Sequence, residues 1–353
     1  MAKHTIWFNK SAANIVNVAN GLRAADVEQQ LRVVVSHPVK DLDVALPWCE
    51  FHKEPNLAGA AYLEWALAFC REQGVTVLVC GKQAGYLADF KEEFAKVGTK
   101  LMVAVSSDDF AVLDDKDLAY KAIIAGGAAD IVPPYAVAAT ADEFAQALAR
   151  LAPEGKLCFK PTVSIFGIGF RIITDEEHKT GLDRLLSGDV TFISKGELST
   201  LMAEKPSFKP LMVMPYLADN ERSIDCVAHE GKLVACVIRR KVSQGQVLED
   251  NPLLVGYVER LVQIFGLDNF FNAQFREKDG KYYLLEINPR MSGGTHYTFH
   301  SGLNLPYLGV MLKLGLIAPA DIPANITGVR VYPVEDAVSA PVVDNNNTPN
   351  EEA

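Results

Sequence analysis

The order of hydrophobic and polar positions divides the first 110 residues into alternating strands and helices. Short apolar runs predict four strands, at 5–8, 31–35, 75–80 and 100–105. The stretches between them predict helices at 14–25, 62–72 and 88–96. Strands separated by helices pair in parallel, so residues 1–110 predict an open parallel α/β sheet lobe. The strand ends are Asn9, Ser36, Gly81 and Ser106, where open sheets bind ligands, although each alone is typical of a strand-ending turn.

Polar and apolar positions alternate again in two later stretches, 269–275 and 281–287, which predict a β-hairpin. Asp279-Gly280 joins them, and this pair is typical of a type I′ turn. The pairing brings Gln274 near Glu286. Because side chains on a strand alternate between faces, Glu286, Asn288 and Arg290 share one side, while Ile287 points into the core.

The residues on that shared side carry the most specific chemistry of the chain. A single Glu on a strand is usually a solvated surface carboxylate. Here a carboxylate and an amide oxygen are followed by Arg290 and by Ser292-Gly-Gly, a combination with no evident folding purpose. Hard oxygen donors at this spacing suit Mg²⁺ with bound phosphates, and a guanidinium there offsets the charge of a transferring phosphoryl group.

Two lysines lie at predicted element ends upstream. Lys160 ends the apolar strand 157–160 and precedes the Ser/Gly loop 162–169, whose backbone N–H groups can line an anion. A plain turn between two strands is the alternative, because Gly167-x-Gly169 lacks the third glycine of a dinucleotide fingerprint. Lys116 opens a helical stretch and can equally be a solvated residue of its first turn.

Three further stretches read as strands around a cleft. Residues 209–217 form an apolar run with a polar end at 218–221, and 223–227 alternates as a half-buried strand should. In the following strand Arg239 and Lys241 share one face. They are either an ordinary basic strand end or, for Arg239, a bidentate partner for a carboxylate or acyl phosphate.

With these motifs in order, the sequence resembles the ATP-grasp superfamily, in the branch of carbamoyl phosphate synthase and the carboxylate–amine ligases. The resemblance rests on Gln274 followed by Glu286-x-Asn288-x-Arg290, and it runs from about Asp114 to Tyr332. It implies a Rossmann-like pre-ATP-grasp lobe, 1–110, and an α+β ATP-grasp domain, 111–335. That domain would divide into a central lid lobe, about 140–215, and a carboxyl-terminal lobe, about 216–335. The polar tail 336–353 predicts disorder.

The resemblance also implies roles for residues in these motifs. Gln274, Glu286 and Asn288 would face Mg²⁺, or Mn²⁺ as an alternative, and Arg290 would contact the phosphates. Lys116 and Lys160 would bind the ATP phosphates under a lid containing Ser164, Gly167 and Gly169. The hinge that reads adenine by its backbone would be Met214, Pro215, Tyr216 and Leu217, and Glu221 would bind ribose. Many relatives carry Glu where this chain has Pro215, which keeps the carbonyl acceptor but loses the carboxylate.

The function implied is that of an ATP-dependent, ADP-forming ligase that joins a small-molecule carboxylate to an amine. Phosphorylation of a carboxylate or carbamate without ligation is one alternative, and an ATP-sensing module without turnover is another. A dinucleotide-dependent dehydrogenase is disfavoured because no GxGxxG follows Phe8. The oligomeric state stays open, with a homodimer among the options.

Composition agrees with an enzyme of small molecules. At 353 residues and 49% hydrophobic, the chain can bury the cores of two or three lobes. A net charge of −10 without a basic stripe argues against a nucleic-acid surface. Neither a membrane-length apolar run nor a signal-like start is evident, so we expect no membrane partner and a cytoplasmic location. The six cysteines lack metal spacing and predict reduced core thiols.

Two remaining features are less specific. Residues 174–204 are longer than a simple lid requires and predict an additional cover over the site. His296 and His300 stand at i, i+4 spacing, which is compatible with a metal pair on a helix. No cysteine or adjacent Glu completes a zinc site, so substrate contact or helix packing is the favoured interpretation.

Overall fold

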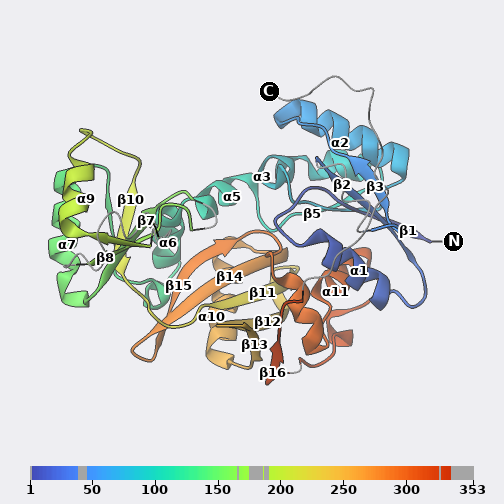
Figure 1. Cartoon of the computed structure of the whole chain (residues 1–353). Coiled ribbons are helices and arrows are strands. Elements are labelled where there is room, and N and C mark those ends of the chain that lie inside the picture. Colours follow the sequence, from blue (N-terminus) through green and yellow to red (C-terminus); the bar gives the residue numbers. More distant parts are fainter. Residues whose placement is uncertain are drawn as a thin grey trace.

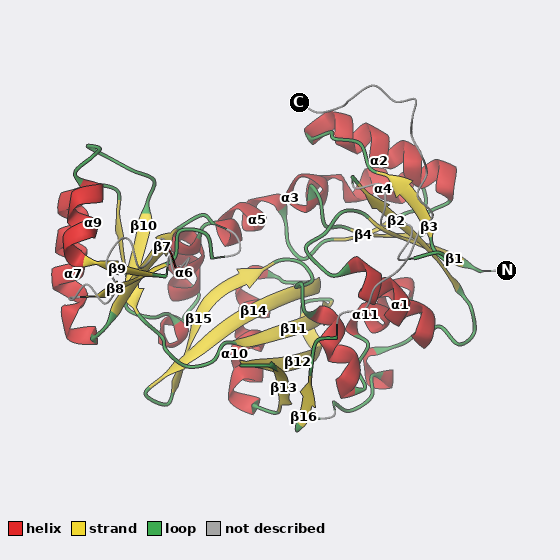
Figure 2. Cartoon of the chain, viewed as in Figure 1, coloured by secondary structure: helices red, strands yellow, loops and turns green. Residues whose placement is uncertain are grey.

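The computed structural model describes residues 2–38, 46–164, 167–174, 186, 191–325 and 327–334. These residues build three β-sheets that follow one another along the sequence (Figure 1). Helices pack on the sheets, as the colouring by secondary structure shows (Figure 2). The predicted tail 336–353 lies outside the described residues, as does most of 175–190. No helix within the described part is long and apolar enough to cross a membrane.

The first sheet is parallel throughout, as predicted, with strand order β3-β2-β1-β4-β5. Its strands are β1 (His4–Phe8), β2 (Leu31–His37), β3 (Glu50–Lys53), β4 (Val77–Val79) and β5 (Lys100–Met102). The helices of this part are α1 (Ile15–Ala25), α2 (Gly59–Gln73), α3 (Ala84–Leu87), η2 (Ala88–Phe90) and α4 (Lys91–Lys96). Strand β3 was not predicted, because Glu-Phe-His-Lys has one apolar residue and no strand-like run.

Two helices, α5 (Ser107–Asp114) and α6 (Lys116–Ala125), lead from the first sheet to the second. The second sheet has order β6-β10-β7-β8-β9, and only β8 and β9 pair in parallel. Its strands are β6 (Ala136–Ala138), β7 (Leu157–Pro161), β8 (Arg171–Thr174), β9 (Phe192–Ser194) and β10 (Leu211–Pro215). The short turns and helices around it are η3 (Ala129–Ile131), α7 (Ala141–Leu151), η4 (Ala152–Glu154) and α9 (Lys195–Met202). Apolar residues of α7 and α9 pack on its strands in one core cluster.

The third sheet is antiparallel, with order β15-β14-β11-β12-β13-β16. Its strands are β11 (Arg222–His229), β12 (Lys232–Val242), β13 (Gly245–Glu249), β14 (Asn269–Lys278), β15 (Lys281–Asn288) and β16 (Val329–Val331). The helices here are α10 (Pro252–Phe265), η5 (Thr295–Ser301), α11 (Leu305–Leu314) and η6 (Pro319–Asp321). The three sheets span 4–102, 136–215 and 222–331, while the exact lobe boundaries given above stay predictions.

The two faces of the third sheet differ in character. Ile224, Cys226 and Ile287 point to one face and pack, with their neighbours, against the apolar side of α10. That helix starts with Pro252 after the N-cap Asn251, a combination that fixes the first turn. Because side chains alternate, the polar residues between these apolar positions all face the other way. This opposite face forms the floor of the site described next.

Candidate active site

A large pocket of about 1390 Å³ opens over the polar face of the third sheet. Parts of all three sheet regions contribute to its wall, from Asn14, which caps α1, through Lys160 on β7 to Glu286 on β15. Its charged lining consists of six cations and three anions, which are Lys116, Lys160, Arg239, Lys241, Arg276, Arg290, Asp114, Glu221 and Glu286. The chain as a whole is acidic, with a net charge of −10. Such a locally positive cavity in an acidic protein favours an anionic ligand.

The predicted hairpin is confirmed in detail. Asp279 and Gly280 have φ of 53° and 77°, as a type I′ turn requires at both central positions. Gln274 stands directly opposite Glu286, and Asn272 opposite Asn288. An irregularity in the pairing follows Gln274, yet the side chains of this pair still lie on the polar face.

The three residues predicted to face a metal ion, Gln274, Glu286 and Asn288, all line the pocket. Asn288 Nδ2 donates to Glu286 Oε1 at 3.2 Å, so the amide and the carboxylate are already in contact. Among the described residues no group of three His, Cys, Asp or Glu side chains gathers as a metal site. One carboxylate with two amides does not suit zinc, but it suits Mg²⁺, which retains water and binds phosphate oxygens. The donor set therefore fits the ion that the sequence predicts.

The two predicted phosphate-binding lysines meet beside this row. Lys116 is buried at the start of α6, and its Nζ lies 3.1 Å from the Ser164 carbonyl and 3.5 Å from Glu286 Oε2. Lys160 Nζ donates to the Leu285 carbonyl at 3.2 Å. The pKa of Lys160 is lowered to about 8, mainly by burial and secondly by the charge of the nearby Lys116, while Glu286 opposes the shift. Two neighbouring lysines, one of which lowers the affinity of the other for a proton, favour a polyanion between them.

The glycine-rich loop lies over the same lysines. Ser164 and Gly167 line the pocket, whereas Gly169 is turned toward Pro161, whose ring would be 2.8 Å from an added Cβ. Ile165 and Phe166, at the tip, lie outside the described residues. The Ser164 carbonyl places the start of this loop beside Lys116, while its function as a lid stays a prediction.

The hinge residues 214–217 span the end of β10 and line the pocket. The Tyr216 N–H donates to the Lys156 carbonyl at 2.7 Å, and the Leu217 carbonyl accepts from Arg276 Nη1 at 3.0 Å. Arg276 is a pocket cation that sequence reasoning missed. It stands two residues after Gln274 on β14, and the strand alternation alone would have placed it on the same face.

Glu221, predicted to bind ribose, lies at the far end of the hinge and lines the pocket. Its Oε1 pairs with Lys241 Nζ at 2.6 Å. Lys241 is half exposed, whereas Glu221 is mostly buried. A ligand hydroxyl could therefore replace Lys241 as the partner of Glu221 at little cost in free energy.

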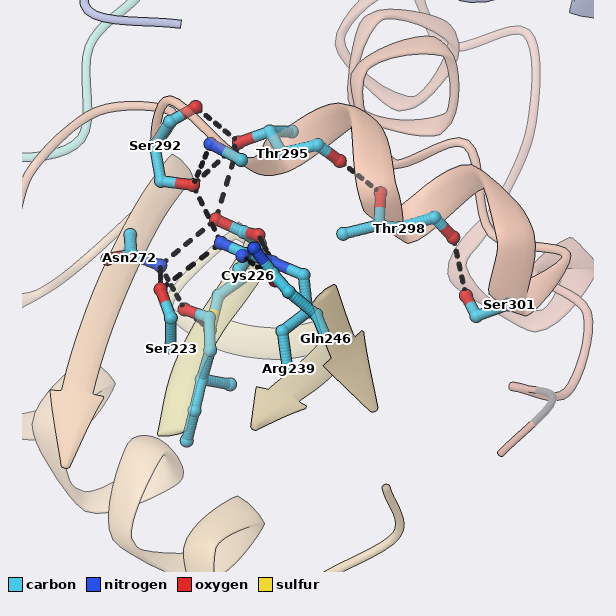
Figure 3. A network of polar contacts seen from close by, with 12 residues as sticks. Ser223, Cys226, Arg239, Gln246, Asn272, Ser292, Thr295, Thr298 and Ser301 are labelled. Atoms are coloured by element: carbon cyan, nitrogen blue, oxygen red, sulfur yellow. Dashed lines mark hydrogen bonds and ion pairs between the residues drawn. The ribbon is translucent and has the colours of Figure 1, made fainter. Parts of the chain in front are cut away.

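Arg239 lies in a buried polar network, shown in Figure 3. Its Nε donates to Asp225 Oδ2 at 2.7 Å, and its Nη2 donates to Ser223 Oγ at 3.1 Å and to Ser292 Oγ at 2.9 Å. Nη1 contacts Gln246 Oε1. Because these bonds use four of its five N–H groups, the guanidinium is fixed in one orientation at the pocket wall.

Asp225 is the centre of that network and was not singled out by sequence reasoning. Its Oδ1 accepts from Asn272 Nδ2 at 3.0 Å and from Thr295 Oγ1 at 3.3 Å. These contacts join β11 to β14 and to the start of η5. The alternation of Ser223 and Asp225 with apolar residues carried a signal, since it puts both on the polar face, but their partners are distant in sequence.

Arg290 follows β15 and stands next to the metal-facing row. Its Nη2 lies 3.3 Å from Asn288 Oδ1, and the side chain lines the pocket. Burial lowers the pKa of the guanidinium, while Glu286 and Asp114 oppose this shift. The cation is therefore held partly desolvated, which strengthens its attraction for a phosphoryl oxygen.

The residues at the strand ends of the first sheet pair with one another. The buried Glu54 accepts from Ser36 Oγ at 2.7 Å and from the Tyr62 hydroxyl at 3.1 Å. Asn9 Oδ1 accepts from the Gly81 N–H at 2.6 Å. These contacts agree with the interpretation as structural turns. The wall of the pocket on this side comes instead from α1 and the residue that caps it, through Asn14, Asn17 and Asn20.

The chain is similar to known proteins in sequence and in fold. The family described as ATP-grasp in the biosynthetic pathway with Ter operon matches residues 207–337. The carbamoyl phosphate synthase large chain of Clostridium perfringens is 24% identical over 212 residues. That match covers 55% of this chain and 18% of the relative, so the chain corresponds to about a fifth of the relative's length.

Solved structures share the fold over most of the chain. N5-carboxyaminoimidazole ribonucleotide synthetase from Thermus thermophilus superposes with a TM-score of 0.63 at 13% identity, covering 92% of this chain and 81% of that one. The biotin carboxylase-beta-gamma-ATP complex from Campylobacter jejuni has a TM-score of 0.59 at 15% identity, covering 90% and 73%. At such identities the likeness establishes the fold.

Proposed function

The chain belongs to the ATP-grasp superfamily, and we propose that it is an ADP-forming ligase that activates a carboxylate as an acyl phosphate for attack by an amine. One observation carries the proposal. The row of Gln274, Glu286 and Asn288 lies in the same pocket as Lys116, Lys160 and Arg290, so phosphate-binding cations surround a metal-binding row.

In this proposal the nucleotide lies between the second and third sheets. The hinge 214–217 holds adenine, and Glu221 accepts hydrogen bonds from ribose in place of its contact with Lys241. Lys116 and Lys160 bind the phosphates. The similar biotin carboxylase structure is a beta-gamma-ATP complex, and this supports the choice of nucleotide.

Phosphoryl transfer would take place where the terminal phosphate meets the part of the pocket wall formed by Arg239 and Arg290. A carboxylate oxygen of the substrate attacks the γ-phosphorus, whose bond to the bridging oxygen breaks so that ADP leaves with the electron pair. Arg290 offsets the charge of the transferring group. Arg239, fixed by Asp225, orients the carboxylate or the acyl phosphate. Gln274, Glu286 and Asn288 would hold Mg²⁺, which when bound supplies further charge neutralisation. Such a site works by positioning, without a covalent enzyme intermediate.

Isotope transfer tests this mechanism. Candidate carboxylates labelled with heavy oxygen are supplied with ATP and an amine, and the released inorganic phosphate is analysed by mass. We expect one labelled oxygen per phosphate together with ADP. AMP as the stoichiometric product, or unlabelled phosphate, would overturn the acyl phosphate mechanism. Carboxylate-dependent ADP release that needs no amine would instead indicate phosphorylation without ligation.

A further inference from the structure

His296 lies in the pocket and is so far without a role. It belongs to η5, which follows β15 and Arg290 in the chain, and it is half-buried. Its Nδ1 is buried and makes no hydrogen bond within the described structure. His300, four residues on in the same helix, is exposed.

The hydrogen bonds of η5 determine where His296 points. Side chains three residues apart on a 3₁₀ helix share a face. Thr295, Thr298 and Ser301 form the anchored face, with the Thr295 hydroxyl bound to Asp225 as Figure 3 shows. His296 and Phe299 share the next face, and the Phe299 ring packs over Gly21 of α1. His296 therefore lies on the face of η5 that is turned toward α1 and the pocket.

The surroundings keep the His296 ring neutral. Burial is the main factor that lowers its pKa, and the positive charge of Arg239 on β12 and the nearby His300 lower it further. The Gly293 backbone and Asp225 on β11 oppose this shift without cancelling it. A neutral imidazole at neutral pH has a free nitrogen lone pair and can accept a proton.

The proposed ligation requires such an acceptor. An amine is protonated at neutral pH and must lose a proton before its nitrogen can attack. Among the charged groups that line the pocket, Glu221 and Glu286 already pair with lysines. Asp114 is exposed and lies beside Arg290, on the phosphate side. The lysines and arginines are cations. His300 also lines the pocket, but it is exposed, so the half-buried His296 is the pocket group best suited to the task.

We propose that His296 is the general base for the amine nucleophile, which approaches between η5 and α1. This inference depends on the proposed function. The imidazole takes one proton from the ammonium group, the nitrogen forms a bond to the acyl carbon, and the bond from that carbon to the phosphate oxygen breaks. Phosphate leaves with the electron pair and carries the second proton of the nitrogen. His296 then returns its proton to solvent.

Comparing ammonia with hydroxylamine tests the proposal. Hydroxylamine is already a neutral nucleophile at neutral pH, so it traps an acyl phosphate as a hydroxamate without a base. Wild type and His296→Asn receive ATP, one of the two nucleophiles, and bicarbonate or each L-amino acid as carboxylate. We expect His296→Asn to lose amide formation with ammonia by about 10²- to 10⁴-fold and to keep hydroxamate formation close to the wild-type rate.

Equal loss with both nucleophiles, or an unchanged rate with ammonia, would overturn the role of His296. So would an equally large, ammonia-specific loss in His300→Asn, the comparison variant on the same helix. Absence of any hydroxamate from the wild type would count against the proposed function itself. A carbon-13 NMR titration of the His296 ring gives a readout without substrate. We expect a neutral ring at pH 7, and a protonated one would overturn the inference independently.

Discussion

Lys116 Nζ and Glu286 Oε2 lie 3.5 Å apart in the pocket, and this ion pair joins the start of α6 to β15. One was predicted to bind phosphate and the other a metal ion, and here they neutralise each other. A ligand that brings both a metal cation and phosphates can satisfy the two groups at once. Lys116 then exchanges the Glu286 carboxylate for a phosphate, and Glu286 exchanges the Lys116 ammonium for the metal cation. This ion pair therefore keeps both groups in place for a metal-nucleotide complex without leaving a buried charge unpaired.

Replacement of Glu286 tests the metal assignment. Glu286→Gln removes the one carboxylate from the row of three oxygen donors, so we expect turnover to fall by about 10²-fold or more at ordinary Mg²⁺. The matched control is Glu277→Gln on the preceding strand, whose carboxylate pairs with Arg222 and not with the row. ADP release is the measurement for both variants. Wild-type activity in Glu286→Gln would remove the metal assignment.

Lys160→Ala separates phosphate binding from a structural role. The lysine lies beside Lys116 under the glycine-rich loop, so we expect the affinity for ATP and ADP to fall together, by about 10- to 100-fold. Adenosine has no phosphates, and its affinity should change little. Calorimetric titration with the three ligands provides the comparison. Equal losses for all three would mean that Lys160 supports the fold of the site.

Local patterns were sufficient to predict the hairpin that carries the site. Asp279-Gly280 specifies its turn, and alternation specifies which side chains share a face, so the pairing of Gln274 with Glu286 followed from sequence. The N-terminal parallel sheet followed in the same way, except for β3. Its sequence, Glu50–Lys53, is held in the sheet by pairing with β2 and not by a hydrophobic run of its own.

Contacts between distant segments could not be predicted. The pattern of residues 223–227 puts Asp225 on a polar face, but nothing local shows that Arg239, Asn272 and Thr295 converge on it. The same holds for Lys116, whose helix start was predicted while its contact with Glu286 was not. Such contacts depend on how the sheets and helices pack against one another. Local sequence patterns do not show this packing.

The lowered pKa of Lys160 predicts proton uptake on nucleotide binding. In the free protein this pKa is about 8, against 10.5 for an ordinary lysine, so the fold disfavours the charged form. The folded state then binds fewer protons than the unfolded state between these values. The resulting cost to stability, about 3 kcal/mol, is fully present below pH 8 and is relieved as the pH rises toward 10.5.

Phosphates beside Lys160 favour its charged form and raise the pKa again. At pH 9 we therefore expect the protein to take up about one proton when ATP binds. Calorimetry in two buffers of different ionisation enthalpy measures this number directly. Lys160→Met should abolish the uptake and raise the melting temperature of the free protein at pH 7. ATP binding without proton exchange in the wild type would show that Lys160 stays charged in the free pocket.

The last prediction concerns the tight approach of Gly294 to Arg239. A Cβ at position 294 would lie 2.6 Å from Nη1 and 3.0 Å from Cζ of Arg239, closer than real carbon contacts allow. The guanidinium cannot yield easily, because Asp225, Ser223 and Ser292 hold it. The φ of Gly294 is −98°, which any residue adopts, so the effect of an added methyl group is steric alone.

We therefore expect Gly294→Ala to lower the free energy of unfolding by about 1–3 kcal/mol and to weaken substrate-dependent ADP release, because Arg239 is displaced from the wall. Gly256→Ala is the matched control. Gly256 lies within α10 with nothing within 4 Å of its added Cβ, so the same change should stabilise the protein by about 0.5–1 kcal/mol and leave activity intact. Thermal unfolding and ADP release are measured for both. Gly294→Ala with wild-type stability and activity would show that Arg239 can move freely, and its proposed role in orienting the carboxylate would then be untenable.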